Sequence, residues 1–187
     1  DGLDVDLAIA VDCGDVRRMG AVGQVALQAG VPLINLDHHP TNTLFGQVNL
    51  VDPETVAASE GVLDWLDTLA PDLTYATAFC LLTGIVTDTL CFRTDSVRPD
   101  TLGKAQRLMA CGASLSEIVQ RTVNRRSAAG MRLWRAVMPT VQLEDHVIWA
   151  VITRELYEAA DYPEHDDAGL VGMLIQVDEA YISAVFK

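Results

Sequence analysis

Apolar and polar positions in the first fifty residues predict a strand–helix–strand unit. Residues 7–11 form a short apolar run that ends at Asp12, and residues 31–36 form a second run that ends at Asp37. Between these runs, residues 17–28 carry apolar side chains at near-helical spacing. Such a unit builds a parallel sheet, and ligands bind beyond the carboxyl ends of its strands. We therefore expect both aspartates at the ligand-binding edge of a parallel sheet.

The hydrophobic pattern of the remaining chain changes character near Pro139. Before it, we expect a strand at residues 48–51, a helix that starts at Ser114, and helices at residues 59–69, 75–86, 100–111 and 128–137. After it, β-rich segments at residues 141–143, 147–153 and 181–186 alternate with short helices near residues 154–159 and 168–177. The pattern predicts an α/β protein: residues 1–138 form a parallel-sheet domain with helices on both faces, and residues 139–187 begin a smaller α/β domain.

Charge and composition narrow the classes of partner. The formal net charge is −13, whereas affinity for duplex nucleic acid comes largely from Lys and Arg that neutralise phosphates. No duplex DNA is therefore expected as a partner. No apolar stretch is long enough to cross a bilayer, and no signal-peptide pattern opens the chain, so no membrane partner is expected. The four cysteines are scattered, which favours reduced thiols in a cytoplasmic protein.

Five acidic and imidazole residues follow expected strands or a helix. Asp12, Asp37, His38 and His39 follow the first two strands, and Asp88 follows the apolar run 75–86. A two-metal site for phosphoryl transfer needs carboxylate ligands and often imidazole, and an Asp-His pair is a common way to orient a metal-binding imidazole. Taken singly, each residue also fits an ordinary turn or helix end.

The order of the surrounding motifs is more specific than any single residue. The motifs are Val11-Asp12-Cys13-Gly14, Asp37-His38-His39-Pro40, Val51-Asp52-Pro53-Glu54, Ser59-Glu60, Gly84-Ile85-Val86-Thr87-Asp88-Thr89 and Cys91-Phe92-Arg93-Thr94. Together they resemble the DHH phosphoesterase family, within it most nearly the bifunctional oligoribonuclease and 3′-phosphoadenosine-5′-phosphate phosphatase type. Residues 145–187 resemble the opening of the DHH-associated domain that follows in such proteins.

The resemblance implies a metal-ligand role for three residues. Asp12 matches the aspartate that bridges two metal ions, His38 matches an imidazole ligand of one ion, and Asp88 matches a carboxylate ligand of that same ion. The implied cofactor is Mn²⁺ or Mg²⁺, with two ions in a full-length protein, because oxygen-rich ligation with limited imidazole suits these ions better than zinc.

The resemblance also implies roles in catalysis and substrate binding. Asp37 would orient His38 or its neighbour through a hydrogen bond, and His39 would face the substrate phosphate as a hydrogen-bond donor or proton carrier. Arg93 is close to the Asp88 motif in sequence, so we consider it as a substrate contact alongside the solvated position usual for arginine.

The family's first motif and its late glycine-rich segment have no match among these residues. We therefore expect a chain truncated at both ends, which carries only part of the metal and substrate sites. The prediction is that the 187-residue polypeptide alone has little or no phosphoesterase activity.

The resemblance implies a manganese-dependent hydrolase that attacks phosphorus with a metal-bound hydroxide. Its substrates would be short oligonucleotides or 3′,5′-bisphosphorylated nucleotides. A cyclic-dinucleotide phosphodiesterase, a pyrophosphatase of the same superfamily and a non-catalytic nucleotide-binding module remain alternatives. The oligomeric state stays open, with a homodimer among the options.

Overall fold

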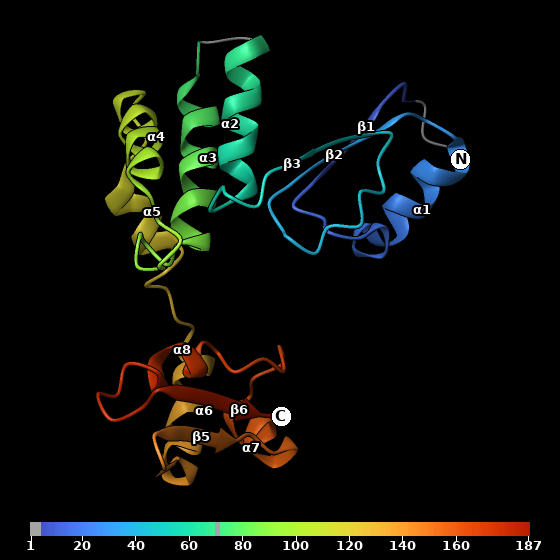
Figure 1. Ribbon diagram of the computed structural model, residues 1–187. Coiled ribbons are helices and arrows are strands. Elements are labelled where there is room, and N and C mark those ends of the chain that lie inside the picture. The colour runs from blue at the N-terminus through green and yellow to red at the C-terminus, as the bar shows by residue number, and fades with distance from the viewer. Residues whose placement is uncertain (1–4, 70–71) are drawn as a thin grey trace. The chain divides into compact units, whose positions relative to one another are not determined.

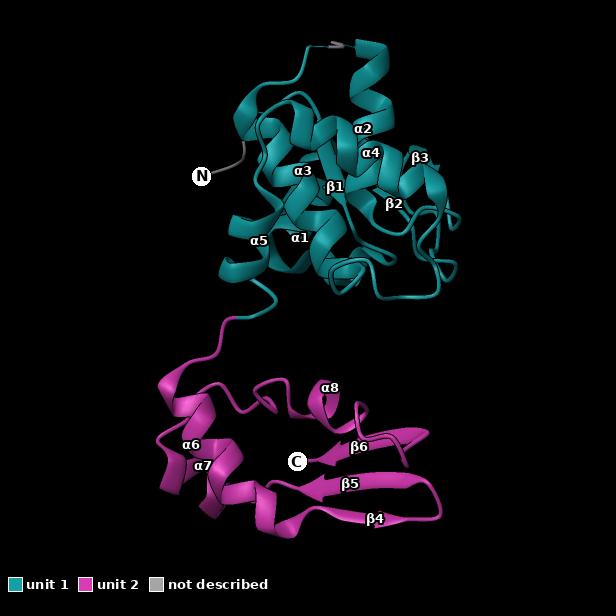
Figure 2. Ribbon diagram, turned by 90° about the vertical axis from the view of Figure 1, so that its left-hand side faces the viewer, with its two compact units in different colours: residues 1–124 teal, residues 125–187 magenta. Residues whose placement is uncertain are grey.

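The computed structural model describes residues 5–69 and 72–187, and the chain divides into two compact units. The first unit ends at Asn124, and the second runs from Arg125 to Lys187 (Figure 2). Over the described residues, no helix combines the length and the apolar character that a membrane crossing needs. Each unit has its own hydrophobic core.

The first unit contains a parallel sheet of three strands in the order β1-β2-β3 (Figure 1). The strands are β1 (Ala8–Val11), β2 (Leu33–Asp37) and β3 (Val48–Val51), and both neighbouring pairs are parallel. The predicted α/β class and parallel sheet are confirmed. Because the strands share one direction, the residues that follow β1 and β2 gather at one edge of the sheet.

Helices of the first unit fall close to their predicted positions. They are η1 (Val16–Met19), α1 (Gly20–Ala29), α2 (Ala58–Leu69), α3 (Tyr75–Asp88), α4 (Pro99–Ala110) and α5 (Leu115–Arg121). The expected helix at residues 17–28 starts as a 3₁₀ turn, because the Asp15 side chain accepts from the backbone N–H of Arg17. Gly30 ends α1 in the left-handed region at φ 68°, which glycine adopts without a steric penalty.

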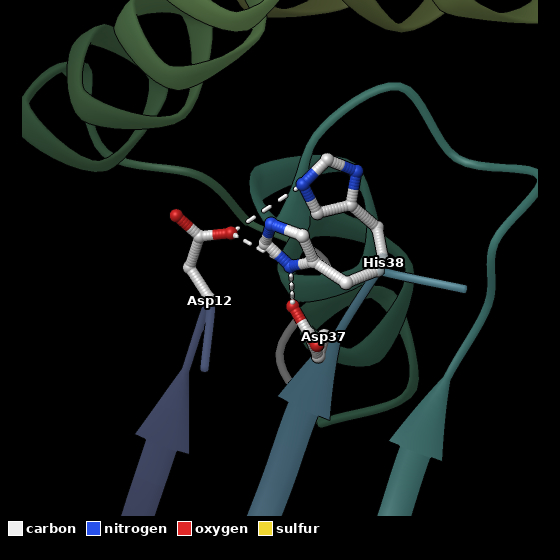
Figure 3. A group of neighbouring side chains, drawn as sticks. Asp12, Asp37 and His38 are labelled. Carbon is white, nitrogen blue, oxygen red and sulfur yellow. Dashed lines mark hydrogen bonds and ion pairs between the residues drawn. The ribbon is translucent and has the colours of Figure 1, made fainter. Parts of the chain in front are cut away.

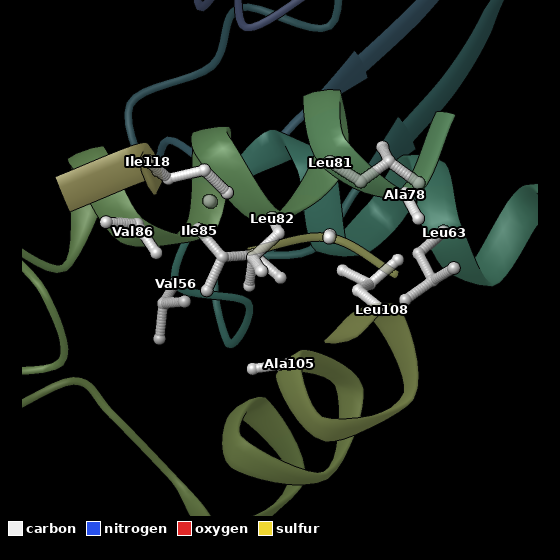
Figure 4. Close-up of a cluster of buried hydrophobic side chains, with 12 residues drawn as sticks. Val56, Leu63, Ala78, Leu81, Leu82, Ile85, Val86, Ala105, Leu108 and Ile118 are labelled. Carbon is white, nitrogen blue, oxygen red and sulfur yellow. The ribbon is translucent and has the colours of Figure 1, made fainter. Parts of the chain in front are cut away.

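The core of the first unit lies among α2, α3, α4 and α5 (Figure 4). Leu63, Leu82, Ile85, Leu108 and Ile118 are fully buried there. The buried residues of α3 in this core are Ala78, Leu81, Leu82, Ile85 and Val86, whereas its first two residues are exposed. Buried packing along the length of α3 holds its last residue, Asp88, at a defined place.

The second unit is built on a mixed sheet in the order β4-β5-β6. Its elements are α6 (Ala128–Val137), η2 (Met138–Thr140), β4 (Gln142–Glu144), β5 (Val147–Val151), α7 (Arg154–Ala160), α8 (Leu170–Leu174) and β6 (Ile182–Phe186). Strand β4 is antiparallel to β5, and β6 is parallel to it. Leu133 and Val137 of α6 are fully buried in the core of this unit. The boundary between the compact units therefore lies before α6, between residues 124 and 125. The change in hydrophobic pattern predicts a domain boundary between residues 138 and 139.

Candidate metal centre

Four side chains converge at the carboxyl edge of the parallel sheet (Figure 3). Asp12 follows β1, Asp37 is the last residue of β2, and His38 and His39 come next in the chain. One ligand atom from each of these residues lies within 4.8 Å of the others. The strand ends thus bring together residues that are separated by 25 positions in the sequence.

Asp12 has an unusual backbone conformation, with φ 61°. This left-handed region is costly for most residues, and aspartate is one of the few that adopts it as a single residue. The Asp12 N–H still donates to the Leu36 carbonyl at 3.0 Å, so the chain turns immediately after its last sheet bond. The Asp12 side chain is 54% exposed, and its Oδ1 lies 3.4 Å from Nε2 of His38. The turn therefore leaves an accessible carboxylate beside an imidazole.

Asp37 holds the ring of His39. The Asp37 carboxylate is buried, and its Oδ1 accepts from Nδ1 of His39 at 2.7 Å, while its Oδ2 accepts from Nδ2 of Asn42 at 2.6 Å. Burial by itself would raise the pKa of Asp37, but the hydrogen bonds from His39 and Asn42 keep that pKa below its ordinary value. Because the carboxylate only accepts, Nδ1 of His39 carries a proton and Nε2 is the free nitrogen.

His38 is held by the backbone. Its Nδ1 lies 3.3 Å from the carbonyl oxygen of Thr55, in the loop that connects β3 with α2. A carbonyl can only accept, so Nδ1 donates and Nε2 is left with its lone pair. That nitrogen faces Oδ1 of Asp12 and lies 3.9 Å from Oδ2 of Asp88.

Asp88 lies beside this group of four residues but is not a member of it, and its Oδ2 is 3.9 Å from Nε2 of His38. Burial, followed by the charge of Asp12, raises the pKa of Asp88 above its ordinary value. After Thr89 the chain reverses through Leu90, Cys91 and Phe92, whose φ angles are 48°, 62° and 60°. The N–H of Cys91 donates back to the Val86 carbonyl at 2.7 Å. This strained left-handed turn fixes where α3 ends and therefore where the Asp88 carboxylate lies.

The distances in this cluster fit a divalent cation. The separations of 3.4 Å and 3.9 Å from Nε2 of His38 to the two carboxylates are longer than ordinary hydrogen bonds. Ligand atoms of one such ion lie roughly 3 Å apart, so Asp12, His38 and Asp88 would have to move closer together to share an ion. Two carboxylates and one imidazole form a hard ligand set, which suits Mn²⁺ or Mg²⁺.

Arg93 is placed differently from the other candidates. Its side chain is exposed, and Nε donates to the carbonyl oxygen of Leu90 at 2.7 Å, within the turn after Asp88. One edge of the guanidinium is therefore occupied by the backbone. A substrate contact from the remaining donors stays a prediction.

Sequence reasoning missed three residues that shape this centre. Asn42 bonds to Asp37, and it also donates to Oδ1 of Asn35 at 2.8 Å. Asn35 is fully buried, and Thr55 supplies the carbonyl that faces His38. A signal was present for Asn35, because a polar residue inside a buried apolar strand requires hydrogen-bond partners. No side-chain pattern could reveal the Thr55 carbonyl.

Comparisons with known proteins agree with this arrangement. No family model matches the chain. The bifunctional oligoribonuclease and PAP phosphatase NrnA of Thermus thermophilus is 35% identical over 162 residues, which cover 84% of this chain and 49% of that protein. The chain belongs to the DHH phosphoesterase family. This DHH chain spans about half the length of that curated relative.

A solved structure supports the fold of this DHH chain. The crystal structure of an exopolyphosphatase-related protein from Bacteroides fragilis superposes with a TM-score of 0.86 and covers 95% of this chain and 53% of that one. Its sequence identity is 21%, so the likeness concerns the fold alone. The α/β architecture read from the sequence is thus shared with a protein of known structure.

Proposed function

We propose that the protein is a metal-dependent phosphohydrolase that cleaves phosphoester bonds in short oligonucleotides or 3′,5′-bisphosphorylated nucleotides. One observation carries the proposal: a carboxylate and two oriented imidazoles converge at the strand ends, with Oδ1 of Asp12 3.4 Å from Nε2 of His38. The Thermus relative is named for both oligoribonuclease and phosphatase activities, which supports this class of substrate.

Asp12, His38 and Asp88 would hold one divalent ion, Mn²⁺ or Mg²⁺, and Asp12 would bridge to a second. A bound ion of this kind lowers the pKa of a water molecule and neutralises charge on the phosphoryl group. The cluster supports the first position through its ligand set and its distances.

His39 would act on the substrate side of the ion. The Asp37 carboxylate fixes the proton on Nδ1, so the free Nε2 can accept a proton or, when protonated, donate to a phosphate oxygen. The low pKa of Asp37 keeps this carboxylate charged at neutral pH, so it remains the acceptor that orients the His39 ring. His39 is therefore proposed as the proton carrier and Asp37 as the residue that orients it.

The acidic surface favours small substrates in the cytoplasm. With a net charge of −13, the protein repels long polyanions, and attraction for a phosphate must come from bound ions and local cations such as Arg93. A dinucleotide or a bisphosphorylated nucleotide presents few charges at a distance from the metal centre.

The test uses the protein at its full natural length with Mn²⁺, a dinucleotide and a 3′,5′-bisphosphorylated nucleotide. We expect hydrolysis of at least one substrate, its abolition by a chelator, and a drop of about 100-fold or more in Asp88→Ala, since such losses exceed those of residues that only support a metal ligand. Asp95→Ala is the control, because Asp95 is exposed. Unchanged turnover in Asp88→Ala, or no hydrolysis of either substrate, would overturn the proposal.

A further inference from the structure

Glu60 is a fully buried acidic residue that the proposed mechanism does not use. It lies in the first turn of α2, and only 1% of its surface is exposed. Oε2 accepts from the backbone N–H of Val56 at 3.2 Å, whereas Oε1 has no hydrogen-bond partner among the described residues. Burying a carboxylate with one unsatisfied oxygen is costly, so its location calls for a reason beyond hydrophobic packing.

Glu60 and His38 bond to the same peptide group, Glu60 to the N–H of Val56 and His38 to the carbonyl of Thr55. Val56 follows Thr55, and the Thr55 carbonyl accepts from Nδ1 of His38 at 3.3 Å. A bond to the N–H of Val56 restrains the peptide unit that contains this carbonyl, because the carbonyl carbon of Thr55 and the nitrogen of Val56 share one plane. The position of the Glu60 carboxylate therefore limits the direction in which the Thr55 oxygen points.

We infer that Glu60 is a positioning residue for His38: it orients the Thr55 carbonyl, which keeps the proton on Nδ1 and presents Nε2 toward Asp12 and Asp88. The inference rests on the proposed function, in which His38 is a metal ligand. Residues that orient a metal-binding imidazole through its second nitrogen tune both ring direction and basicity. Here the effect passes through one peptide group instead of a direct side-chain contact.

Lys104 is a basic residue that interacts electrostatically with Glu60. Its side chain is only 14% exposed, and Nζ contacts Asp64 at 2.8 Å. Burial alone would lower the pKa of Lys104, but the hydrogen bond that Lys104 donates to Asp64 and the charge of Glu60 raise it above its ordinary value. Glu60 and Lys104 thus attract one another electrostatically.

A different reading is that Glu60 only satisfies a free N–H near the start of α2, as acidic residues often do. That role would change the stability of the fold without changing which His38 nitrogen carries the proton. The two readings therefore differ in a spectroscopic measurement made without metal.

The experiment compares Glu60→Leu with Glu60→Gln in the protein at its full natural length. Glutamine retains an oxygen that can accept from Val56, and leucine has similar bulk but no acceptor. In protein labelled with ¹⁵N-histidine at pH 8 and without metal, long-range ¹H–¹⁵N spectra identify the protonated nitrogen of His38. We expect the Nδ1–H form in the wild type and Glu60→Gln, and a mixture of both forms in Glu60→Leu.

Mn²⁺ affinity gives the second readout, measured by electron paramagnetic resonance of the free ion. We expect affinity to fall about 10-fold or more in Glu60→Leu, as for other residues that support a metal ligand, and to stay within about 2-fold of the wild type in Glu60→Gln. Glu54→Leu is the matched control, because Glu54 lies in the same loop and pairs with Arg98 at the surface. An unchanged His38 spectrum in Glu60→Leu would overturn the inference.

Two outcomes separate this inference from the proposed function. If Glu60→Leu alters the His38 spectrum but the wild type hydrolyses neither substrate, the positioning role stands and the proposed function fails. If the wild type is active and Glu60→Leu shows a normal spectrum and normal affinity, only the positioning role fails.

Should Glu60→Leu not fold, Glu60→Asp replaces it, because the shorter side chain keeps the charge and withdraws the acceptor from Val56. The same spectral change is then expected, and its absence contradicts the inference.

Discussion

The imidazole half and the carboxylate half of the candidate centre are organised in opposite ways. On the imidazole side, Asp37 has a side chain with 0% exposure and bonds to both His39 and Asn42. On the carboxylate side, Asp12 and Asp88 are 54% and 37% exposed, and the charge of Asp12 contributes to the raised pKa of Asp88.

The difference shows what the fold can prepare before a ligand arrives. The acceptors of the two imidazoles, the Asp37 carboxylate and the Thr55 carbonyl, are already placed by the fold, so these rings can be fixed in advance. Two nearby carboxylates repel one another until a cation lies between them. We therefore expect substitutions of Asp12 and Asp88 to affect metal binding first, and those of Asp37 and His39 to affect turnover first.

The largest expected effect is a loss of metal affinity in Asp12→Asn. Asparagine adopts the left-handed backbone of this position, so the fold is preserved while one negative ligand is removed. Affinity for Mn²⁺ should fall by about 100-fold or more, beyond the loss that follows removal of a supporting residue. Resonance titration of free Mn²⁺ measures it, with Asp95→Asn as the control. Affinity within a few-fold of the wild type would remove the distinction between the two halves.

Asp37→Asn tests the imidazole half. The substitution keeps the side-chain volume but removes the charge that fixes the proton of His39, so turnover should fall about 10- to 100-fold. Mn²⁺ affinity should change far less than in Asp12→Asn. Steady-state kinetics and the same metal titration give the two numbers. Equal losses in turnover and in Mn²⁺ affinity would contradict the expected difference between the two halves of the centre.

The pKa of Asp37 also predicts a pH dependence of stability. Because the folded protein lowers this pKa, the ionised carboxylate stabilises the fold at every pH above the unfolded value of 3.8. The contribution is lost as the pH falls below 3.8 through the lower folded pKa. Denaturant unfolding of wild type and Asp37→Asn should therefore converge at acid pH and separate at neutral pH.

Gly84→Ala changes the carboxylate half through packing. A Cβ at Gly84 would lie 2.6 Å from Oγ and 2.9 Å from Cβ of Ser59, so α2 and α3 must move apart one turn before Asp88. Overpacking of this kind costs about 1–3 kcal/mol of unfolding free energy, and Mn²⁺ affinity should fall as well. Gly103→Ala is a matched control, because among the described residues no atom outside its own helix backbone and chain neighbours lies within 4 Å of the new Cβ. This variant should gain about 0.5–1 kcal/mol.

The smallest expected effect is a gain in stability of the metal-free protein in Asp88→Asn. The folded state raises the pKa of Asp88, so protonation stabilises the fold at low pH and this benefit is lost as the pH rises through the folded value. The neutral asparagine side chain of Asp88→Asn retains this stabilisation at pH 7. For a half-exposed group we expect about 0.5 kcal/mol after screening, or roughly 1–2 °C in Tm. Calorimetry without metal should show the gain, and saturating Mn²⁺ should reverse the ranking.

Hydrophobic periodicity predicted most elements of the fold because the strands and helices are strongly patterned. The boundary between the compact units was harder to predict from the sequence. The amphipathic pattern of α6 does not indicate in which of the two cores Leu133 and Val137 are buried. The strand-end rule also placed Asp12 near Asp37 and its histidines. The sequence alone did not show which of the two histidines bonds to Asp37. In the structure the loop after β3 brings the Thr55 carbonyl to His38, and Asp37 bonds to His39.

The direction of α3 has an electrostatic consequence for the order of binding. This helix of 14 residues ends at Asp88, and its aligned peptide groups place about half a negative elementary charge at that end. Internal hydrogen bonds in the following turn satisfy the last carbonyls without cancelling their dipoles. The backbone itself therefore attracts a cation, even where the Asp88 side chain is neutral. The same field repels a phosphate group, so we expect the metal ion to bind before the substrate.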